Sequence, residues 1–153
     1  MLTYESHSRA PADRVWPLLA EPDRWSDWAP HLRGAWGLGS REVRPGARGA
    51  VRLLGVVPVP AHITAKEPGR SWDWRVGPVW FRHRVTPAPD GSVVGIDIAA
   101  PEPLESALRV SYGPLVMVLV RNLARVADRS RRRPTAAAPT PPAPGSASRR
   151  RPG

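Results

Sequence analysis

Arg14-Val-Trp-Pro-Leu-Leu-Ala-Glu-Pro-Asp-Arg-Trp-Ser-Asp-Trp28 is the stretch of the chain that decides the fold. Its first half has the apolar spacing of a short helix that buries Val15, Trp16, Leu18 and Leu19. Pro17 removes one hydrogen bond within that helix, so we expect it to be short or kinked. Pro22 ends the pattern, and Trp25 and Trp28 follow three positions apart, which places both rings on one side of a second short helix.

The segments on either side of this stretch have the pattern of strands. Leu2 to Ser8 alternates between apolar and polar side chains, which predicts a first strand. Turn signals such as Pro68-Gly69 and Gly77-Pro78 separate the later apolar segments. We expect strands at residues 47–55, 59–67, 71–76, 79–86 and 92–99. Short links between consecutive strands predict an antiparallel meander.

The apolar period changes near the end of this region and predicts a long amphipathic helix. The stripe consists of Leu104, Leu108, Tyr112, Leu115, Leu119, Leu123 and Val126, spaced by three or four residues. Gly113-Pro114 interrupts the stripe, so we expect the helix to bend there.

This order of elements resembles the SRPBCC superfamily, which includes START domains, polyketide cyclases and lipid-transfer proteins. The resemblance covers residues 2–128 and depends on the Trp-x-x-Trp pair, on Trp72-Asp-Trp-Arg75, and on the segment from Tyr112-Gly-Pro-Leu to Asn122-Leu-Ala-Arg125. It implies an α+β helix-grip fold, in which a curved antiparallel sheet of six to seven strands wraps around a long C-terminal helix. Two short helices follow the first strand, and a cavity lies between sheet and helix.

Composition predicts one domain and a tail. The 153 residues are 41% hydrophobic, which suits a single core over residues 1–130. The Pro/Ala/Arg-rich segment 131–153 cannot bury enough apolar surface to order itself, so we expect a disordered basic tail. Residues 129–153 contain seven Arg and no acid, which leaves 16 basic against 13 acidic residues, or +3, before them.

Cysteine is absent, so disulfides and thiolate metal sites are excluded. The first residues have neither the basic nor the apolar segment of a signal peptide, and no apolar run is long enough to span a membrane. We therefore expect a soluble, cytoplasmic protein.

Alternation assigns the more apolar face of each strand to the concave side of the sheet. The inward set is Val51, Leu53, Ala61, Ile63, Ala65, Trp72, Trp74, Val76, Val79, Phe81, His83, Val85, Val94, Ile96 and Ile98. The outward set is Arg48, Arg52, His62, Lys66, Asp73, Arg75, Arg82 and Arg84. An apolar, aromatic lining with few polar groups is typical of a pocket for a hydrophobic molecule.

Candidate cavity residues follow from these faces and from the helix stripe. They are Trp28, Trp36, Trp72, Trp74, Phe81, His83, Leu108, Tyr112 and Leu115. Core packing explains an aromatic inward face equally well, and that alternative stays open. His83 either orients a ligand carbonyl or transfers a proton, or it is a buried histidine bonded to a neighbouring side chain. Tyr112 either offers its hydroxyl to a ligand or is a core tyrosine.

Established catalytic and cofactor motifs are missing from the sequence. Gly37-Leu-Gly-Ser-Arg-Glu42 begins like a dinucleotide loop but lacks the third glycine. The four histidines have no metal-ligand spacing, and no Gly-x-Ser-x-Gly motif is present. We therefore assign no catalytic residue, no cofactor and no metal.

Three functions remain. The first is binding or transport of a small hydrophobic ligand, such as a lipid, isoprenoid or polyketide. The second, implied by the resemblance, is a polyketide cyclase or dehydratase. The third is an interaction module whose tail, with Arg131-Arg-Arg133 and Arg149-Arg-Arg151, contacts anionic membrane or nucleic acid. The sequence does not indicate an oligomeric state.

Overall fold

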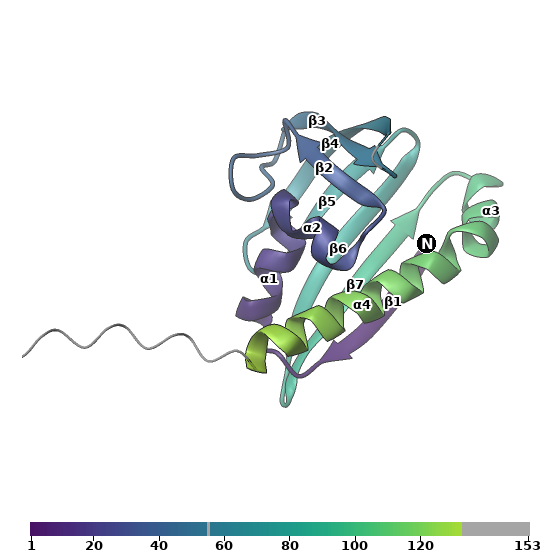
Figure 1. Cartoon of the computed structure of the whole chain (residues 1–153). Coiled ribbons are helices and arrows are strands. Elements are labelled where there is room, and N and C mark those ends of the chain that lie inside the picture. Colours follow the sequence, from purple (N-terminus) through teal and green to yellow (C-terminus); the bar gives the residue numbers. More distant parts are fainter. Residues whose placement is uncertain (55, 133–153) are drawn as a thin grey trace, which may run out of the picture.

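A curved antiparallel sheet and a long helix across its concave face form the domain (Figure 1). The computed structural model describes residues 1–54 and 56–132. Within them the strands are β1 (Leu2–Ser8), β2 (Leu32–Trp36), β3 (Arg48–Leu53), β4 (Val57–Glu67), β5 (Ser71–Val76), β6 (Val79–Ala88) and β7 (Gly91–Ala99). Their order in the sheet is β1-β7-β6-β5-β4-β3-β2. Every neighbouring pair is antiparallel, so the predicted meander and the α+β helix-grip fold are confirmed.

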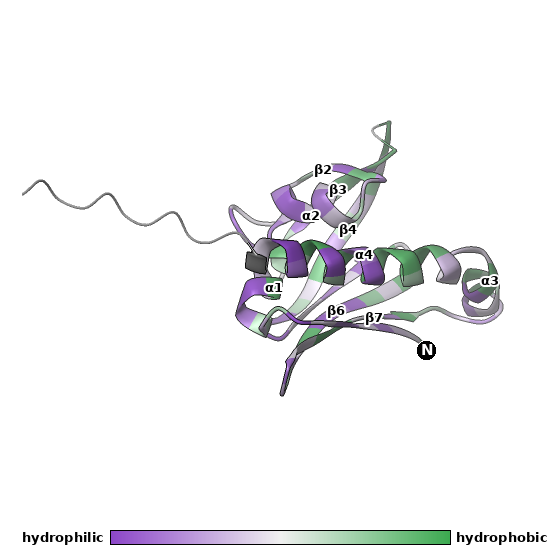
Figure 2. Cartoon of the chain, turned by 60° about the horizontal axis from the view of Figure 1, so that its bottom comes forward, coloured by the Kyte–Doolittle hydropathy of each residue, from purple (hydrophilic) through white to green (hydrophobic). Residues whose placement is uncertain are grey.

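The two short helices after β1 lie where the sequence pattern placed them, whereas the 3₁₀ turn between them and the division of the C-terminal helix were not predicted. The helical elements are α1 (Ala12–Ala20), the single 3₁₀ turn η1 (Pro22–Arg24), α2 (Trp25–Trp28), α3 (Leu104–Ser111) and α4 (Gly113–Arg132). Helix α4 packs on β1, β7, α1 and α2. Figure 2 shows that the part of α4 beside α3 is mostly hydrophobic, whereas its C-terminal part is more hydrophilic.

The C-terminal helix is divided rather than bent. The expected single helix from Leu104 ends at Ser111, and α4 begins at Gly113. A side chain at Gly113 would overlap the hydroxyl of Tyr4 on β1, so glycine lets the backbone approach the sheet there. The helix is therefore interrupted where its backbone comes close to the sheet.

The end of α1 is held by tryptophan side chains. Pro22 stands four residues after Leu18 and has no N–H to donate to the Leu18 carbonyl. The indole of Trp28 donates to that carbonyl at 2.8 Å instead. The indoles of Trp25 and Trp72 both donate to the Leu19 carbonyl, at 2.8 and 3.1 Å. These bonds connect α1 to α2 and to β5.

One expectation about strand faces was wrong. We expected Ala65 to point inward and Lys66 outward, but the register of β4 against β5 shifts between Ile63 and Ala65. This bulge reverses the alternation after Ile63, so Ala65 is exposed. The Lys66 ammonium instead donates to Glu42 Oε2 at 2.6 Å and to the Val43 carbonyl at 3.0 Å.

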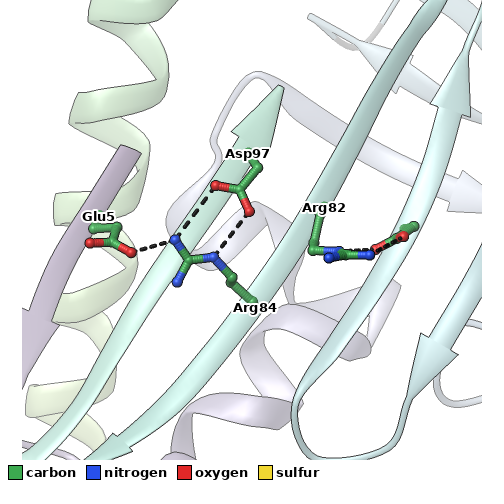
Figure 3. Close-up of polar contacts among 5 residues, drawn as sticks. Glu5, Arg82, Arg84 and Asp97 are labelled. Carbon is green, nitrogen blue, oxygen red and sulfur yellow. Dashed lines mark hydrogen bonds and ion pairs between the residues drawn. The ribbon is translucent and has the colours of Figure 1, made fainter. Parts of the chain in front are cut away.

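Ion pairs cover the outer face of the sheet (Figure 3). Arg82 binds both carboxylate oxygens of Asp73, at 3.0 and 3.1 Å. Arg84 binds Asp97 at 3.0 Å and also pairs with Glu5. These pairs explain how two carboxylates, Asp73 and Asp97, can be only 6% and 7% exposed.

The described residues bear on two further expectations, the absence of a membrane-spanning helix and the basic tail at 131–153. None of the helices in residues 1–54 and 56–132 is both long and apolar enough to cross a membrane. The expected tail overlaps α4 at Arg131 and Arg132, and the rest of it, residues 133–153, lies outside the described residues.

Asp128 fastens the C-terminal half of α4 to the end of β1. Its Oδ1 accepts hydrogen bonds from the Ser8 hydroxyl at 2.7 Å and from the Arg9 N–H at 2.8 Å. Ser8 is fully buried, so its hydroxyl needs these partners. Ser92 donates to the neighbouring Ala10 carbonyl at 2.8 Å and extends the same contact.

We expect Asp128→Ala to lower the free energy of unfolding by about 1–3 kcal/mol, because it removes the acceptor of a buried hydroxyl and of a backbone N–H. Asp128→Asn keeps an amide oxygen in the same place and should cost clearly less. Urea unfolding of both variants measures the difference. Equal losses would show that the charge of Asp128, and not its accepting oxygen, holds the helix.

Candidate functional site

A cavity of about 240 Å³ lies between the concave face of the sheet and the helices. It is lined by Trp28, Ala29, His31, Leu32, Val51, Leu53, Val59, Trp74, Val76, Phe81, His83, Ile96, Leu108, Tyr112, Val116 and Leu119. These residues come from α2 and the link to β2, from the strands β2 to β7, and from the α3–α4 region. No Arg, Lys, Asp or Glu is among them.

Stacked aromatic rings build one wall of the cavity. Trp25 stacks on Trp72 with ring centroids 5.4 Å apart, and His83 stacks on the same indole at 4.2 Å with 4° between the planes. Trp74 meets Trp72 and His83 edge to face, at 5.5 and 5.9 Å. Phe81 continues the contact from Trp74 to Tyr112. Packing against Trp72 and Trp74 therefore holds the His83 ring in place.

Two polar atoms of this wall have no hydrogen-bond partner within residues 1–54 and 56–132. They are Trp74 Nε1 and His83 Nδ1, and both are buried. Trp74 is 7% exposed and His83 is 5% exposed. A buried polar group without a partner costs about 1–3 kcal/mol, so native structures contain few of them. Both atoms belong to residues that line the cavity.

Burial keeps the titratable groups of the cavity in their neutral forms. Burial lowers the pKa of His83 from 6.5 to about 3, and Asp97 opposes that shift only in part. Burial also lowers the pKa of His31 and raises that of Tyr112. Both histidines are therefore neutral at neutral pH, and the lining contains no Asp, Glu, Arg or Lys, so the cavity has no formal charge.

The structure brings six of the nine candidate residues together around the cavity. They are Trp28, Trp74, Phe81, His83, Leu108 and Tyr112. The other three lie outside its lining. Trp72 is in the core behind His83, Leu115 is 40% exposed on α4, and Trp36 is 47% exposed on β2 with Arg52 over its ring.

Sequence reasoning missed several lining residues. Alternation placed Val51, Leu53, Val76 and Ile96 inward without naming them as cavity residues. Ala29 and His31 lie in the link after α2, which has no periodic pattern, and Leu32 begins β2, a strand that the sequence did not predict. Val116 and Leu119 lie on the face of α4 that turns toward the sheet. Leu119 belonged to the expected stripe, whereas Val116 is next to it.

Comparison with protein families gives a match over most of the chain. The family described as "Polyketide cyclase / dehydrase and lipid transport" matches residues 2–131. The chain belongs to this family. The resemblance inferred from the tryptophan motifs is therefore confirmed.

Solved structures share the fold of this family member at low sequence identity. A Nitrosomonas europaea protein is 15% identical, with a TM-score of 0.68 over 84% of this chain and 94% of its own. A Mesorhizobium loti protein is also 15% identical, with a TM-score of 0.65 over 84% of this chain and 97% of its own. A protein in the dynemicin biosynthetic locus is 22% identical, with a TM-score of 0.64 over 84% and 47%. Comparison with curated proteins gives no match.

The lining determines what this family member's cavity offers to a ligand. Aliphatic and aromatic surface surrounds the space, and the few polar groups are uncharged. In the part of the chain that the structure describes, no group of three or more His, Asp or Glu side chains is placed to hold a metal ion. The arrangement favours enclosure of an apolar molecule with a small polar group.

The low pKa of His83 predicts acid destabilisation with a defined range. The unfolded chain takes up a proton near pH 6.5, whereas the folded chain does so only near pH 3. This contribution to stability is complete above the unfolded pKa and decreases as the pH falls below it. From about pH 7.5 to about pH 5 the loss is about 2 kcal/mol.

The variant His83→Phe keeps an aromatic ring on Trp72 and removes the titrating group. We expect its free energy of unfolding to fall less than that of the wild type over the same pH range. Chemical denaturation at several pH values measures both slopes. Parallel pH profiles would show that His83 is not buried in its neutral form.

Proposed function

We propose that the chain binds a small hydrophobic molecule in the cavity between sheet and helices. The observation that carries this proposal is the cavity itself, which combines an apolar lining with two buried, unpartnered nitrogen atoms. Family membership agrees with it, since the family description includes lipid transport. Burial of apolar ligand surface contributes about 25 cal/mol per Å² and would supply most of the affinity.

The size of the cavity favours a ligand of modest size. Its volume of about 240 Å³ lies just below the usual range of about 300–1,000 Å³ for small-molecule pockets. A short lipid, an isoprenoid or a small polyketide fits this class better than a long diacyl lipid does.

Binding or transport is better supported than catalysis. A general base works best when its pKa lies near the working pH. With a pKa of about 3, His83 is a weak proton acceptor at neutral pH. His83 also stacks on an indole, and none of the hydrogen bonds within residues 1–54 and 56–132 joins its ring to a carboxylate that would orient it. His83 is therefore poorly suited to the proton abstraction that the cyclase or dehydratase alternative would require.

The interaction-module alternative depends on the Arg-rich tail. Residues 133–153 lie outside the described residues, so the contacts of the tail with membrane or nucleic acid stay a prediction. The cavity supports ligand binding independently of the tail, because its lining ends at Leu119.

Two neighbouring residues of α4 provide a matched test of the cavity. Val116 is 1% exposed and lines the cavity, whereas Leu115 is 40% exposed and lies outside it. Val116→Phe fills the space, and we expect it to weaken binding of the fluorescent probe aminoanthracene by about tenfold or more. Leu115→Phe should leave the affinity within about twofold of the wild type. These factors correspond to about 1.4 and 0.4 kcal/mol.

Thermal unfolding shows whether each variant is folded, because a larger side chain in a packed core costs about 1–3 kcal/mol. Val76→Phe, at a half-buried lining position, serves as the second filling variant. If the wild type does not bind the probe, or if both filling variants bind as the wild type does, the probe does not enter this cavity and the proposal is rejected.

A further inference from the structure

The polar atoms of the cavity wall carry information about the ligand's head group. Three buried indoles, those of Trp25, Trp28 and Trp72, each donate to a main-chain carbonyl of α1. The indole of Trp74 is equally surrounded by the core, yet it has no acceptor within residues 1–54 and 56–132. His83 Nδ1 is the second atom of this kind. A chain that pairs its other core indoles leaves these two groups unpaired at one place, the cavity wall.

The side chains of Trp74 and His83 are neighbours in the wall of the cavity. Trp74 and His83 lie on the inner faces of the neighbouring strands β5 and β6. Trp74 pairs with Phe81 and His83 pairs with Trp72, so the two residues are diagonal neighbours. Their ring centroids are 5.9 Å apart and their planes meet at 75°. Packing on Trp72 fixes both rings, so little ordering is needed when a ligand enters.

Hydrogen-bonding capacity limits the ligand group that fits. An indole N–H only donates, so the group against Trp74 must accept. A neutral imidazole nitrogen donates or accepts according to its tautomer, so His83 Nδ1 serves a carbonyl in one tautomer and a hydroxyl in the other. Ketones, esters and alcohols satisfy both side chains.

Charge limits the ligand further. The lining contains no Arg or Lys that could pair with a buried anion. Arg82 and Arg84, the basic residues on either side of His83 along β6, point to the outer face, where they pair with Asp73 and Asp97. His83 itself is neutral because burial lowers its pKa. A carboxylate in this cavity would lose its hydration and gain no counter-charge.

We propose that Trp74 and His83 together hold the uncharged oxygen of the ligand, a carbonyl or a hydroxyl, and that the cavity discriminates against ligands with an ionised carboxylate. This inference rests on the proposed function and goes beyond it by naming the head group. Ordinary fatty-acid anions are thereby excluded, and neutral ketones, esters and alcohols are included.

Four small ligands of matched shape test the proposal by displacement of aminoanthracene at neutral pH. They are benzylacetone, a ketone; methyl hydrocinnamate, an ester; hydrocinnamate, the corresponding carboxylate; and butylbenzene, which has no polar atom. We expect the ketone and the ester to bind best and the carboxylate to bind at least thirtyfold more weakly than its methyl ester. A carboxylate that binds as well as its ester overturns the proposal.

Substitutions of Trp74 and His83 test whether these side chains cause the preference for a ligand with an oxygen atom. The quantity measured is the ratio of the affinity for benzylacetone to the affinity for butylbenzene. Trp74→Phe should lower this ratio about three- to tenfold, because the loss of one hydrogen bond affects only the ketone. His83→Phe should lower it as well. Taking the ratio to butylbenzene cancels changes in cavity size, and Leu115→Phe is the control with an unchanged ratio. A ratio that stays constant in both cavity variants overturns the role of these two residues.

The displacement experiment distinguishes failure of ligand binding in the cavity from failure of the head-group assignment. If none of the four ligands displaces the probe, or if the probe does not bind, the proposed cavity function fails. If butylbenzene and hydrocinnamate bind as well as the ketone, the cavity function stands and the head-group assignment is wrong.

Discussion

The carbonyl groups at the end of α1 are the point on which the cavity wall depends. A helix leaves its last carbonyls unpaired, and Pro22 removes one donor that could have continued the chain of bonds. The indoles of Trp25, Trp28 and Trp72 fill this gap by donating to Leu18 and Leu19. Since these indoles come from α2 and β5, the same bonds set the distance between the first helices and the middle of the sheet. They also fix Trp72, on which His83 stacks.

Because those three indoles are hydrogen-bonded, the neighbouring atoms Trp74 Nε1 and His83 Nδ1 stand out as unpaired. Stable cores satisfy buried polar groups, and departures from that rule concentrate at functional sites. Among the buried side-chain nitrogen and oxygen atoms of residues 1–54 and 56–132, only one atom of Trp74 and one of His83 depart from it, and both residues line one cavity. The fold therefore bears the cost of two unpaired nitrogens beside a wall that hydrogen bonds elsewhere hold rigid. On the head-group proposal, this local cost is recovered when a ligand oxygen pairs with the two side chains.

The sequence predicted the order of elements better than the site. Tryptophan spacing, alternation and the helical stripe were sufficient for six of the seven strands, for α1 and α2, and for a C-terminal helical region. They missed β2 and the division of that region into α3 and α4. Alternation failed after Ile63, because the bulge arises from the pairing of β4 with β5 and has no signal in the sequence of β4 itself. It also could not separate Trp72, behind the wall, from Trp74, in the wall. Both point inward, and the difference depends on which indole reaches the carbonyls of α1.

The charged side chains of the central strands lie on the outer face of the sheet, and the cavity lies against the inner face. Along β6, Arg82 and Arg84 alternate with Phe81 and His83, so the ion pairs gather outside and the apolar surface inside. A buried histidine next to an inward carboxylate would have a higher pKa and could exchange protons near neutrality. Asp97 instead faces outward and is bound by Arg84, so it offsets the desolvation of His83 only in part. Selectivity in this cavity must therefore come from neutral dipoles, which suits recognition of an oxygen atom more than the transfer of a proton.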